Sequence, residues 1–229
     1  MSQKPIICTI DVVLLCLRGA TLHVALLKRD KPPFEGGYAL PGGYIHPEED
    51  ADTLEAAARM LREKTGIVSP YLEQLCTFSG SARDPRGWSI SIVYYALVPA
   101  DLIKPDLSPG LQLQAVDQLK ILPFDHKEIV LAAVGRVRNK SSYSSLPVYL
   151  CGDQFTLPRL QAVYEAILNE PINKVSFRRK MEELDILEPI EGELEVGRAN
   201  RPAQLYRLKN QYRNRLSLSG RSMTANLDH

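Results

Sequence analysis

The stretch of the sequence that decides the fold is Leu40-Pro-Gly-Gly-Tyr-Ile-His-Pro-Glu-Glu-Asp-Ala-Asp-Thr-Leu-Glu-Ala-Ala-Ala-Arg-Met-Leu-Arg-Glu-Lys-Thr-Gly66-Ile67. It predicts a glycine-rich loop that leads into a helix. Asp52 or Thr53 can cap the first turn, and Glu55 follows Asp52 at the spacing of a capping box. Three consecutive alanines favour helix, and Gly66 supplies a left-handed residue at which such a helix ends. The stretch therefore predicts a loop, a helix and a second loop in that order.

This stretch resembles the Nudix box, the signature of enzymes that cleave nucleoside diphosphates linked to another group. The family pattern is Gly, five residues, Glu, seven residues, then Arg-Glu-aliphatic-any-Glu-Glu-any-Gly-aliphatic. The positions that fit this pattern are Gly43, Glu49, Arg59, Leu61, Glu63, Gly66 and Ile67. The resemblance implies an α/β (α+β) fold, the Nudix α/β/α sandwich.

The box departs from the family pattern where the family's chemistry lies. In the family the glutamates hold divalent metal ions against a pyrophosphate, and Mg²⁺ prefers several oxygen ligands. Here Met60 offers a soft thioether, and Lys64 places a cation where a carboxylate is expected. The loop is also longer, since Gly43 and Arg59 are sixteen positions apart and the family spaces them by fourteen. We therefore expect no catalytic residues and no metal site, with a degenerate box at Glu49, Arg59, Met60, Glu63 and Lys64.

Two alternatives stay open for the box. Glu63 and Arg59 are four residues apart, so they can pair on one helix face. The carboxylates of Glu48, Glu49, Asp50 and Asp52 could rebuild a metal site from the loop, or they could form a solvated acidic loop.

Length and charge suggest two parts. The chain has 229 residues, enough for one Nudix-sized domain and a smaller one. Its net charge of +1 gives no whole-protein attraction to nucleic acid. The charge is distributed unevenly along the chain, because residues 196–221 contain seven Lys or Arg and no Asp or Glu. Such a basic block is typical of a nucleic-acid contact.

The remaining composition indicates a cytoplasmic protein. Cys8, Cys16, Cys76 and Cys151 are far apart and form no CxxC pair, so we expect reduced thiols rather than disulfides or a zinc site. No secretory signal is expected at the start of the chain. No apolar stretch approaches the roughly 18 residues of a membrane-spanning helix, so no membrane partner is expected.

The first domain is expected to cover residues 1–147. Apolar and alternating patterns predict strands at 6–17, 22–28, 38–40, 71–79 and 88–98, and another strand at 119–122. Valines at helical spacing predict a helix at 127–137. The Ser-rich residues 139–145 are expected to form a linker.

The second domain is expected to cover residues 148–212. A helix is predicted after Pro158, a second helix at 174–184, and a hairpin with a basic tip at 191–208. Helix, basic helix and basic hairpin form the outline of a winged helix-turn-helix. Residues 213–229 are expected to be a disordered tail.

Three stretches together resemble the Nudix-related transcriptional regulators of NAD metabolism. They are the degenerate box, Arg83-Asp84-Pro85-Arg86-Gly87, and the pair Phe177-Arg178-Arg179-Lys180 and Arg201-Pro202-Ala203-Gln-Leu-Tyr206. The resemblance implies a bacterial repressor that forms a homodimer and binds double-stranded operator DNA near NAD biosynthesis or salvage genes. It also implies release when ADP-ribose, or a related NAD metabolite, binds the Nudix domain as effector, with no cofactor required.

Cations and a glycine turn offer a site for a pyrophosphate. Guanidinium groups and free backbone N–H groups are the groups that hold phosphates, and aromatic faces can carry an adenine or ribose. The candidate ligand-binding residues are Arg29, Tyr38, Gly42, Gly43, Arg83, Arg86 and Gly87, with Tyr44 or Trp88 as further aromatic candidates. The bland alternatives are a type I turn with solvated charges at residues 83–87, and edge packing for the aromatic rings.

The second predicted helix carries groups suited to DNA. A helix in the major groove needs Lys, Arg, Ser or Asn at its N-terminal end and exposed face, and a wing can reach the backbone or minor groove. The candidate DNA-binding residues are Asn173, Lys174, Ser176, Arg178, Arg179 and Lys180 on the helix, and Arg198, Asn200 and Arg201 on the wing. An amphipathic helix with a solvated basic face is the alternative.

Two other functions compete with a ligand-responsive repressor. One is an active ADP-ribose or nucleoside-diphosphate pyrophosphatase with an accessory C-terminal domain; Met60 and Lys64 disfavour it. The other is RNA binding or decapping, which predicts aromatic stacking surfaces in the second domain. Tyr164, Phe177 and Tyr206 are expected instead to pack in the core.

Overall fold

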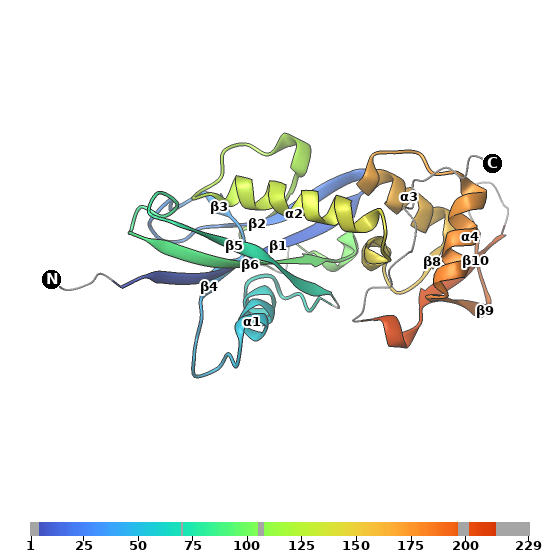
Figure 1. Ribbon diagram of the computed structural model, residues 1–229, viewed down its shortest axis with the longest axis horizontal. Coiled ribbons are helices and arrows are strands. Elements are labelled where there is room, and N and C mark those ends of the chain that lie inside the picture. The colour runs from blue at the N-terminus through green and yellow to red at the C-terminus, as the bar shows by residue number, and fades with distance from the viewer. Residues whose placement is uncertain (1–4, 70, 105–107, 197–201, 214–229) are drawn as a thin grey trace. The chain divides into compact units, whose positions relative to one another are not determined.

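The computed structural model describes residues 5–69, 71–104, 108–196 and 202–213. The chain divides into two compact units, Met1–Val134 and Gly135–His229, and Figure 1 labels their elements. Each unit has a hydrophobic core of its own. In the part of the chain that is described, no helix is long and apolar enough to cross a membrane.

The first unit is built on a seven-stranded sheet. Its strands are β1 (Ile7–Arg18), β2 (Thr21–Lys28), β3 (Tyr38–Ala39), β4 (Gly42–Tyr44), β5 (Leu72–Gly80), β6 (Ser89–Leu97) and β7 (Leu111–Ala115). The order is β3-β2-β1-β6-β5, with β4 also pairing β1 and β7 also pairing β2. Strands β1 and β6 run parallel and the other pairs are antiparallel. The mixed sheet follows from the apolar runs of the sequence, and the predicted strands up to residue 98 are confirmed.

Helices cover both faces of this sheet. Helix α1 (Thr53–Thr65) lies on one face and α2 (His126–Ser141) begins on the other, as Figure 1 shows. Asp52 caps α1 by accepting the N–H groups of Leu54 and Glu55, and Gly66 ends it with a φ of 71°. Ala56, Ala57 and Leu61 of α1 pack on the inward face of β1. The predicted loop–helix–loop and the Nudix sandwich are confirmed.

One strand was predicted at the wrong place. The alternating sequence Leu111–Ala115 forms β7 against β2, whereas the predicted strand at 119–122 follows the short 3-10 helix η3 (Val116–Gln118). Residues 119–122 form no strand, and Ile121 is 93% exposed although Leu119 and Leu122 are buried. Alternation was the better signal here than an apolar run, because one face of an edge strand is solvated.

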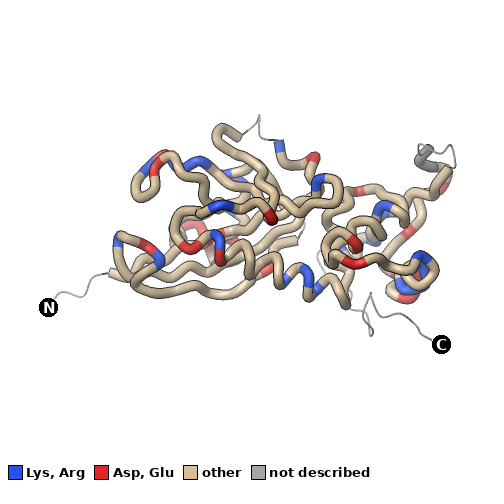
Figure 2. Tube along the Cα trace, turned by 90° about the horizontal axis from the view of Figure 1, so that it is seen from above, with Lys and Arg blue, Asp and Glu red and all other residues tan. Residues whose placement is uncertain are grey.

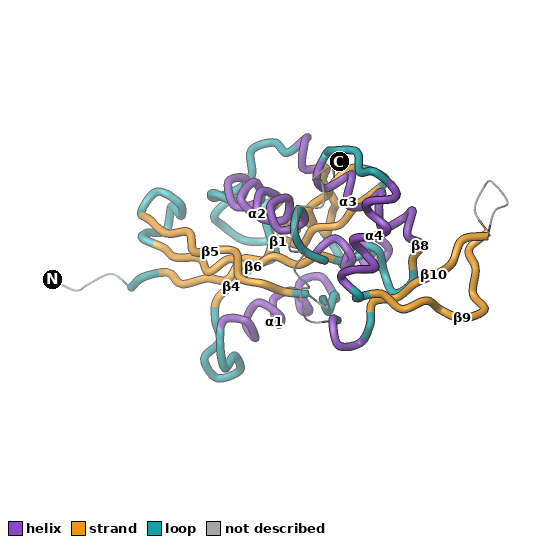
Figure 3. Tube along the Cα trace, turned by 45° about the vertical axis from the view of Figure 1, so that its right-hand side comes forward, coloured by secondary structure: helices purple, strands orange, loops and turns teal. Residues whose placement is uncertain are grey.

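The second unit has the architecture of a winged helix. Helix α3 (Leu157–Leu168) and helix α4 (Lys174–Leu184) pack against a sheet of order β8-β10-β9. The strands are β8 (Phe155–Thr156), β9 (Leu187–Val196) and β10 (Pro202–Leu208), drawn in orange in Figure 3. Tyr164 and Phe177 meet edge to face at 5.4 Å in the core. The predicted helices and hairpin are confirmed, and the predicted core positions of Tyr164 and Phe177 with them.

The Ser-rich segment is packed, and the prediction of a linker there is wrong. Helix α2 continues to Ser141, and Ser141, Ser144 and Ser145 are buried. Tyr164 Oη donates to the carbonyl oxygen of Ser144 at 2.8 Å. Ser144 Oγ donates back to the Lys140 carbonyl oxygen at 2.6 Å, which reduces the cost of burying that hydroxyl.

The division into compact units falls within α2, between Val134 and Gly135. The domain bounds drawn from the sequence, at residue 147, stay a prediction. The expected tail lies outside the described residues except for Arg213. All four cysteines are unpaired, as predicted.

Candidate ligand cleft and nucleic-acid interface

A cleft of about 230 Å³ opens in the first unit where β1 and β4 meet three loops. Its walls are formed by Thr9, Asp11, Arg29, Asp30, Lys31, Pro32, Leu40, Gly42, Gly43, Tyr44, Arg83, Asp84, Arg86, Phe124 and His126. A second hollow of about 410 Å³ adjoins it, because Arg29, Asp30, Leu40 and Gly42 line both. The two hollows therefore adjoin, with Arg29 and Gly42 among the residues at their junction.

A carboxylate lies at the inner end of the cleft. Asp11 belongs to β1, between the fully buried Ile10 and Val12, and is itself 6% exposed. Ser91 on the neighbouring β6 donates from Oγ to Asp11 Oδ2 at 2.6 Å. Arg83 Nη2 lies 3.8 Å from the same oxygen. The hydroxyl and the guanidinium compensate a charge that would otherwise be costly to bury.

His126 lines the same cleft as a neutral donor. Its Nδ1 accepts the backbone N–H of Leu40 at 3.0 Å, which places the ring proton on Nε2. Nε2 faces Asp11 Oδ1 at 3.7 Å. Burial lowers the pKa of His126, although the carboxylates of Asp11 and Asp125 oppose that effect. The cleft therefore contains an N–H donor beside a carboxylate acceptor, a pair suited to hydroxyl groups.

Arg83 is fixed from both sides. Its Nε and Nη2 donate to the two carboxylate oxygens of Asp125 at 2.9 Å each, and Nη1 donates to Ser89 Oγ at 3.2 Å. The side chain is only 8% exposed. Such a two-point pair holds the guanidinium in one plane. Arg83 therefore contributes a positioned positive charge to the cleft wall.

Arg86 is held at the rim by Asp84 and Tyr44. Its Nη2 donates to Asp84 Oδ2 at 2.7 Å, and its Nη1 donates to Tyr44 Oη at 2.9 Å. Burial alone would raise the pKa of Asp84, but the hydrogen bonds from Arg86 lower it. The same hydrogen bond raises the pKa of Arg86. With its side chain 38% exposed, Arg86 remains accessible to an anion.

Arg29 completes the set of cations. Its Nε donates to the Pro33 carbonyl oxygen at 2.7 Å and its Nη2 to that of Lys31 at 3.3 Å. The guanidinium carbon lies 4.9 Å from the ring centroid of Phe124, within the range of a cation–π contact. Loop carbonyls and an aromatic face thus orient Arg29 at the junction of the two hollows.

Two glycines bring the backbone close to the cleft floor. A Cβ at Gly42 would collide with the Asp11 carboxylate and stand 2.7 Å from the Ile10 carbonyl oxygen. A Cβ at Gly43 would stand 2.8 Å from Met60 Sδ. Gly42 is therefore required by a close backbone approach, which is one of the uses of glycine. Met60 is 3% exposed and belongs to the core beneath this turn.

The arginine of the box binds the acidic loop. Arg59 Nε and Nη2 donate to the two carboxylate oxygens of Asp50 at 2.7 Å each, and Nη1 donates to Glu63 Oε2 at 3.3 Å. The hydrogen bond from Arg59 lowers the pKa of Asp50 to about 2, and the same bond raises the pKa of Arg59. Arg59 Nη2 also donates to the Tyr44 carbonyl oxygen at 3.2 Å. The pairing of Arg59 with Glu63, one of two readings of the sequence, is present.

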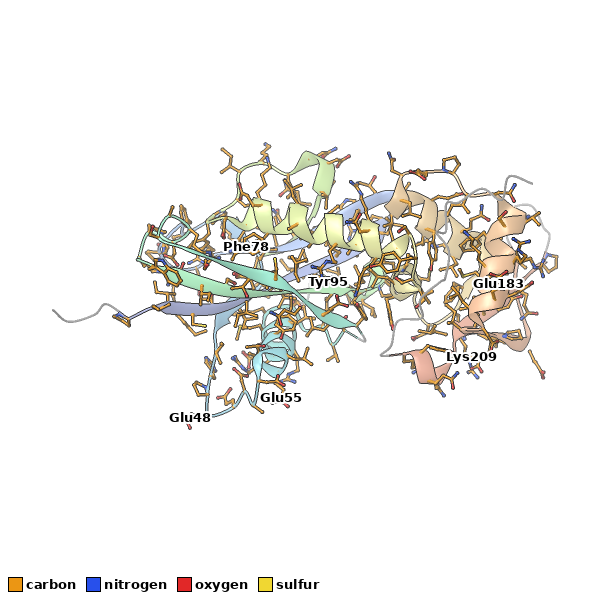
Figure 4. All side chains as sticks on the ribbon, viewed as in Figure 1. Glu48, Glu55, Phe78, Tyr95, Glu183 and Lys209 are labelled. Carbon is orange, nitrogen blue, oxygen red and sulfur yellow. The ribbon has the colours of Figure 1, made fainter. Side chains whose placement is uncertain are left out.

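The other acidic residues of the loop, Glu48, Glu49 and Asp52, do not share one partner. Asp52 caps α1, whereas Glu49 Oε2 lies 3.4 Å from His46 Nδ1 and 3.8 Å from Arg59 Nε. Figure 4 shows Glu48 at the outer end of the loop, away from the sheet. Among the described residues, no group of three or more His, Cys, Asp or Glu could hold a metal ion. The loop carboxylates are thus arranged as structural partners of Arg59 and of the helix start.

The cleft brings together most of the predicted ligand-binding residues, namely Arg29, Gly42, Gly43, Arg83 and Arg86. Two predicted residues are not part of its described wall. Tyr38 pairs with Lys28 as a half-buried edge residue of β3, and Gly87 closes the turn by donating its N–H to the Asp84 carbonyl oxygen at 3.1 Å. Tyr44 lies in the cleft and Trp88 does not.

The sequence prediction missed Asp11, Phe124, Asp125 and His126. Asp11 had a signal, since a lone carboxylate inside the apolar run Ile10–Leu15 must have a partner when buried. The other three precede or begin α2, far from the box along the chain. Only the fold places His126 beside Leu40, eighty-six positions away.

In the second unit, α4 carries an exposed basic face. Lys174, Arg178 and Arg179 are exposed, and Figure 2 marks the basic and acidic positions along the trace. Arg178 Nε lies 3.2 Å from Glu182 and Arg179 Nε lies 3.6 Å from Glu183. Exposed pairs of this kind contribute little, about 0–1 kcal/mol. Both guanidinium groups can therefore be diverted to phosphates at small cost.

Two other predicted DNA-binding residues of α4 have structural roles. Asn173 caps the helix, because its Oδ1 accepts the N–H groups of Val175 and Ser176 at 3.0 and 3.1 Å. Lys180 is 4% exposed, so the expectation that it lies on the exposed basic face is wrong. It falls three residues after Phe177 and one before Met181, on the side of α4 that faces the core. The predicted wing residues Arg198, Asn200 and Arg201 lie outside the described residues.

Comparisons with known proteins match both units. Residues 9–133 match the family model described as "NUDIX domain", and residues 147–208 match that described as "NrtR DNA-binding winged helix domain". A relative from Acinetobacter baylyi, "ADPR responsive transcriptional repressor NtrR", is 37% identical over 203 residues, which is 87% of this chain and 80% of the relative.

Two solved structures of Shewanella oneidensis NrtR are similar. The one "complexed with a 27mer DNA" has a TM-score of 0.87 and 35% identity, over 94% of this chain and 98% of that chain. The NUDIX domain "complexed with ADP ribose" has a TM-score of 0.55 and 33% identity, over 59% of this chain and 90% of that one. These relatives bind DNA and ADP-ribose.

Proposed function

Because this chain belongs to the NrtR family of Nudix proteins with a DNA-binding winged helix domain, we propose that it is a transcriptional repressor released from its operator by ADP-ribose. The second unit binds double-stranded operator DNA. The first unit binds ADP-ribose, or a related NAD metabolite, as effector. The genes it controls belong to NAD biosynthesis or salvage.

The cleft carries the effector half of the proposal. Arg29, Arg83 and Arg86 line one hollow, and each is held in place by protein groups. A diphosphate placed at the junction, near Arg29 and the Gly42 backbone, would leave a sugar end in each of the two hollows. The neutral Nε2–H of His126 and the Asp11 carboxylate suit the hydroxyls of one ribose. The three arginines that line a hollow adjoining a second one are the observation that carries the proposal.

The box supports binding without hydrolysis. Phosphoryl chemistry in the Nudix manner needs carboxylates that are free to hold divalent metal ions. Asp50 is occupied by Arg59, and Met60 is buried under Gly43. Lys64 lines the larger hollow, where its ammonium can attract a diphosphate but cannot hold Mg²⁺. We therefore propose that the protein is a sensor and not a pyrophosphatase.

The proposed DNA binding depends on α4 and on the formation of a homodimer. Lys174, Arg178 and Arg179 present positive charge around the N-terminal half of the helix, the end that enters the major groove in helix-turn-helix proteins. The protein is proposed to act as a cytoplasmic homodimer, because two winged helices on one duplex read two half-sites. Sedimentation of the full chain with and without DNA tests the dimer.

One experiment separates the sensor from the enzyme. A duplex is first selected by the full chain from a random-sequence pool, and binding is then followed by fluorescence anisotropy as ADP-ribose is added. We expect release of the duplex to the same extent in Mg²⁺ and in EDTA, with ADP-ribose recovered intact by chromatography. Robust Mg²⁺-dependent formation of AMP would favour the pyrophosphatase. A mixture of AMP and ribose 5-phosphate serves as the control for release by products.

A further inference from the structure

An exposed apolar side chain lies in the first turn of α4. Val175 is 77% exposed, whereas Phe177 and Met181 of this helix are buried in the core and Leu184 packs against it half-buried. Hydrophobic residues scattered on a surface need no explanation in general. Val175 differs in its setting, because α4 is the second helix of a domain that matches a DNA-binding winged helix family, and in helix-turn-helix proteins the second helix enters the major groove.

The residues on the same face of α4 as Val175 indicate which part of the helix can approach DNA. On an α-helix, residues three and four positions apart share a face, so Val175 shares its face with Arg178 and Arg179, both exposed. The next turn carries Glu182 and Glu183, which phosphates would repel. The N-terminal half of α4 is therefore the part that can lie deep in a groove, with its cations beside the backbone and Val175 between them.

The polar residues of the same turn are less available for reading bases. Asn173 Oδ1 is occupied by two backbone N–H groups, and Ser176 is half-buried. Apolar side chains in the major groove contact the 5-methyl group of thymine, which no other base carries. Valine offers two methyl groups on a stiff, β-branched stem, so it can fill the space beside such a methyl at small entropic cost.

We propose that Val175 is a specificity-determining residue that packs against the 5-methyl group of a thymine in each operator half-site. The inference rests on the proposed repressor function and adds to it the identity of a base. The guanidinium groups of Arg178 and Arg179 position the helix against phosphates, and Val175 discriminates thymine from the other bases.

Replacement of thymine by deoxyuridine tests the contact, because it removes the methyl group and leaves base pairing intact. Each thymine of the selected duplex is replaced in turn, and the affinity is measured for the full chain and for Val175→Ala. We expect the unmodified chain to bind more weakly by roughly fourfold at one thymine per half-site, since a buried methyl contributes about that factor. Val175→Ala should bind the thymine and deoxyuridine duplexes equally.

Two further variants guard against other causes. Val68→Ala is the matched control, because Val68 is 75% exposed in the first unit and should keep the full thymine preference. Val175→Thr retains the branched shape with one methyl, and should show an intermediate preference. Both substitutions lie on the surface, where effects on folding are small.

The outcomes are distinct. An unchanged thymine preference in Val175→Ala overturns the inference while leaving the repressor proposal intact. A shift of Val175→Ala in oligomeric state, with the preference retained, would assign Val175 to a contact between copies and also overturn it. Failure of the unmodified chain to select any duplex would remove both the inference and the function on which it rests.

Discussion

Arg59 of α1 holds Asp50 of the preceding loop through two hydrogen bonds of 2.7 Å each. The arginine of a Nudix box thus pairs with a carboxylate that the loop supplies beside it. Helix and loop are fastened to each other by this pair of side chains. The pairing of Arg59 with Asp50 thus stabilises the loop and helix of the box without a bound metal ion.

The first prediction concerns the pH dependence of this pair. The pKa of Asp50 is lowered to about 2 from an ordinary value of 3.8, so the unfolded chain takes up its proton at higher pH than the folded one. The stabilisation is therefore fully present above about pH 4 and is lost as the pH falls toward 2. Asp50→Asn should unfold at a lower temperature than the unmodified chain at pH 6, and the two should converge at pH 2. Thermal melts across this range measure the difference; a constant gap would contradict the assignment.

A second prediction concerns the glycine at the junction of the hollows. Gly42→Ala places a Cβ against the Asp11 carboxylate and against the backbone carbonyl of Ile10. Ser91 holds that carboxylate by a hydrogen bond. We expect a decrease of about 1–3 kcal/mol in the free energy of unfolding, the usual cost of overpacking, measured by denaturant titration. Gly135→Ala in α2 is the control, since a Cβ there meets open space. It should raise stability by about 0.5–1 kcal/mol.

A third prediction separates two arginines of the cleft from the rest of the surface charge. Arg86→Ala and Arg83→Ala should weaken ADP-ribose binding by about 10- to 100-fold, the size of the effect of removing a hydrogen bond to a charged group. Both variants should then remain on DNA at effector concentrations that release the unmodified chain. Isothermal titration and anisotropy measure the two effects. Arg62→Ala, an exposed change on α1 outside the cleft wall, should release normally.

Arg83 and Arg86 should differ from each other in folding stability. Arg83 lies 3.8 Å from the Asp11 carboxylate and 2.9 Å from that of Asp125. Its removal therefore takes a positive charge away from both carboxylates. Removing Arg86 affects a rim residue that is 38% exposed. Arg83→Ala should thus melt earlier than Arg86→Ala. Equal melting temperatures would indicate that Arg83 is not needed to compensate the negative charge of the buried Asp11 carboxylate.

A fourth prediction addresses the basic face of α4. Arg178→Ala combined with Arg179→Ala should weaken DNA binding and reduce the slope of log affinity against log salt by about 0.9 for each phosphate that these side chains neutralise. Stability should change by less than about 0.5 kcal/mol, because exposed ion pairs contribute little. Stabilisation by ADP-ribose should be unchanged. The matched variant Arg62→Ala with Arg138→Ala removes equal charge from exposed sites elsewhere and should keep the original slope.

The sequence predicted local features well where the chain's own periodicity sets them. The cap at Asp52, the end at Gly66 and the helix beginning after Asn173 follow from rules that act over a few residues. Lys180 shows the limit of such rules, since charge alone suggested an exposed side chain and the packing of α4 buries it. The residues of the cleft floor could not be predicted from the sequence for another reason. Asp11, Ser91 and His126 meet only because β1 and β6 are neighbours in the sheet and α2 begins beside them.

The outward positions of α4 carry a further consequence. Lys174, Val175, Arg178 and Arg179 are exposed, whereas the cap at Asn173 and the buried Phe177 and Met181 hold the helix in place. In the proposed repressor, folding and base recognition would thus depend on different residues of the same helix. Substitutions at the exposed positions of α4, in evolution or by design, would then change the DNA sequence that such a repressor binds without changing the residues that stabilise its fold. One metabolite sensor can in this way be redirected to new sets of genes.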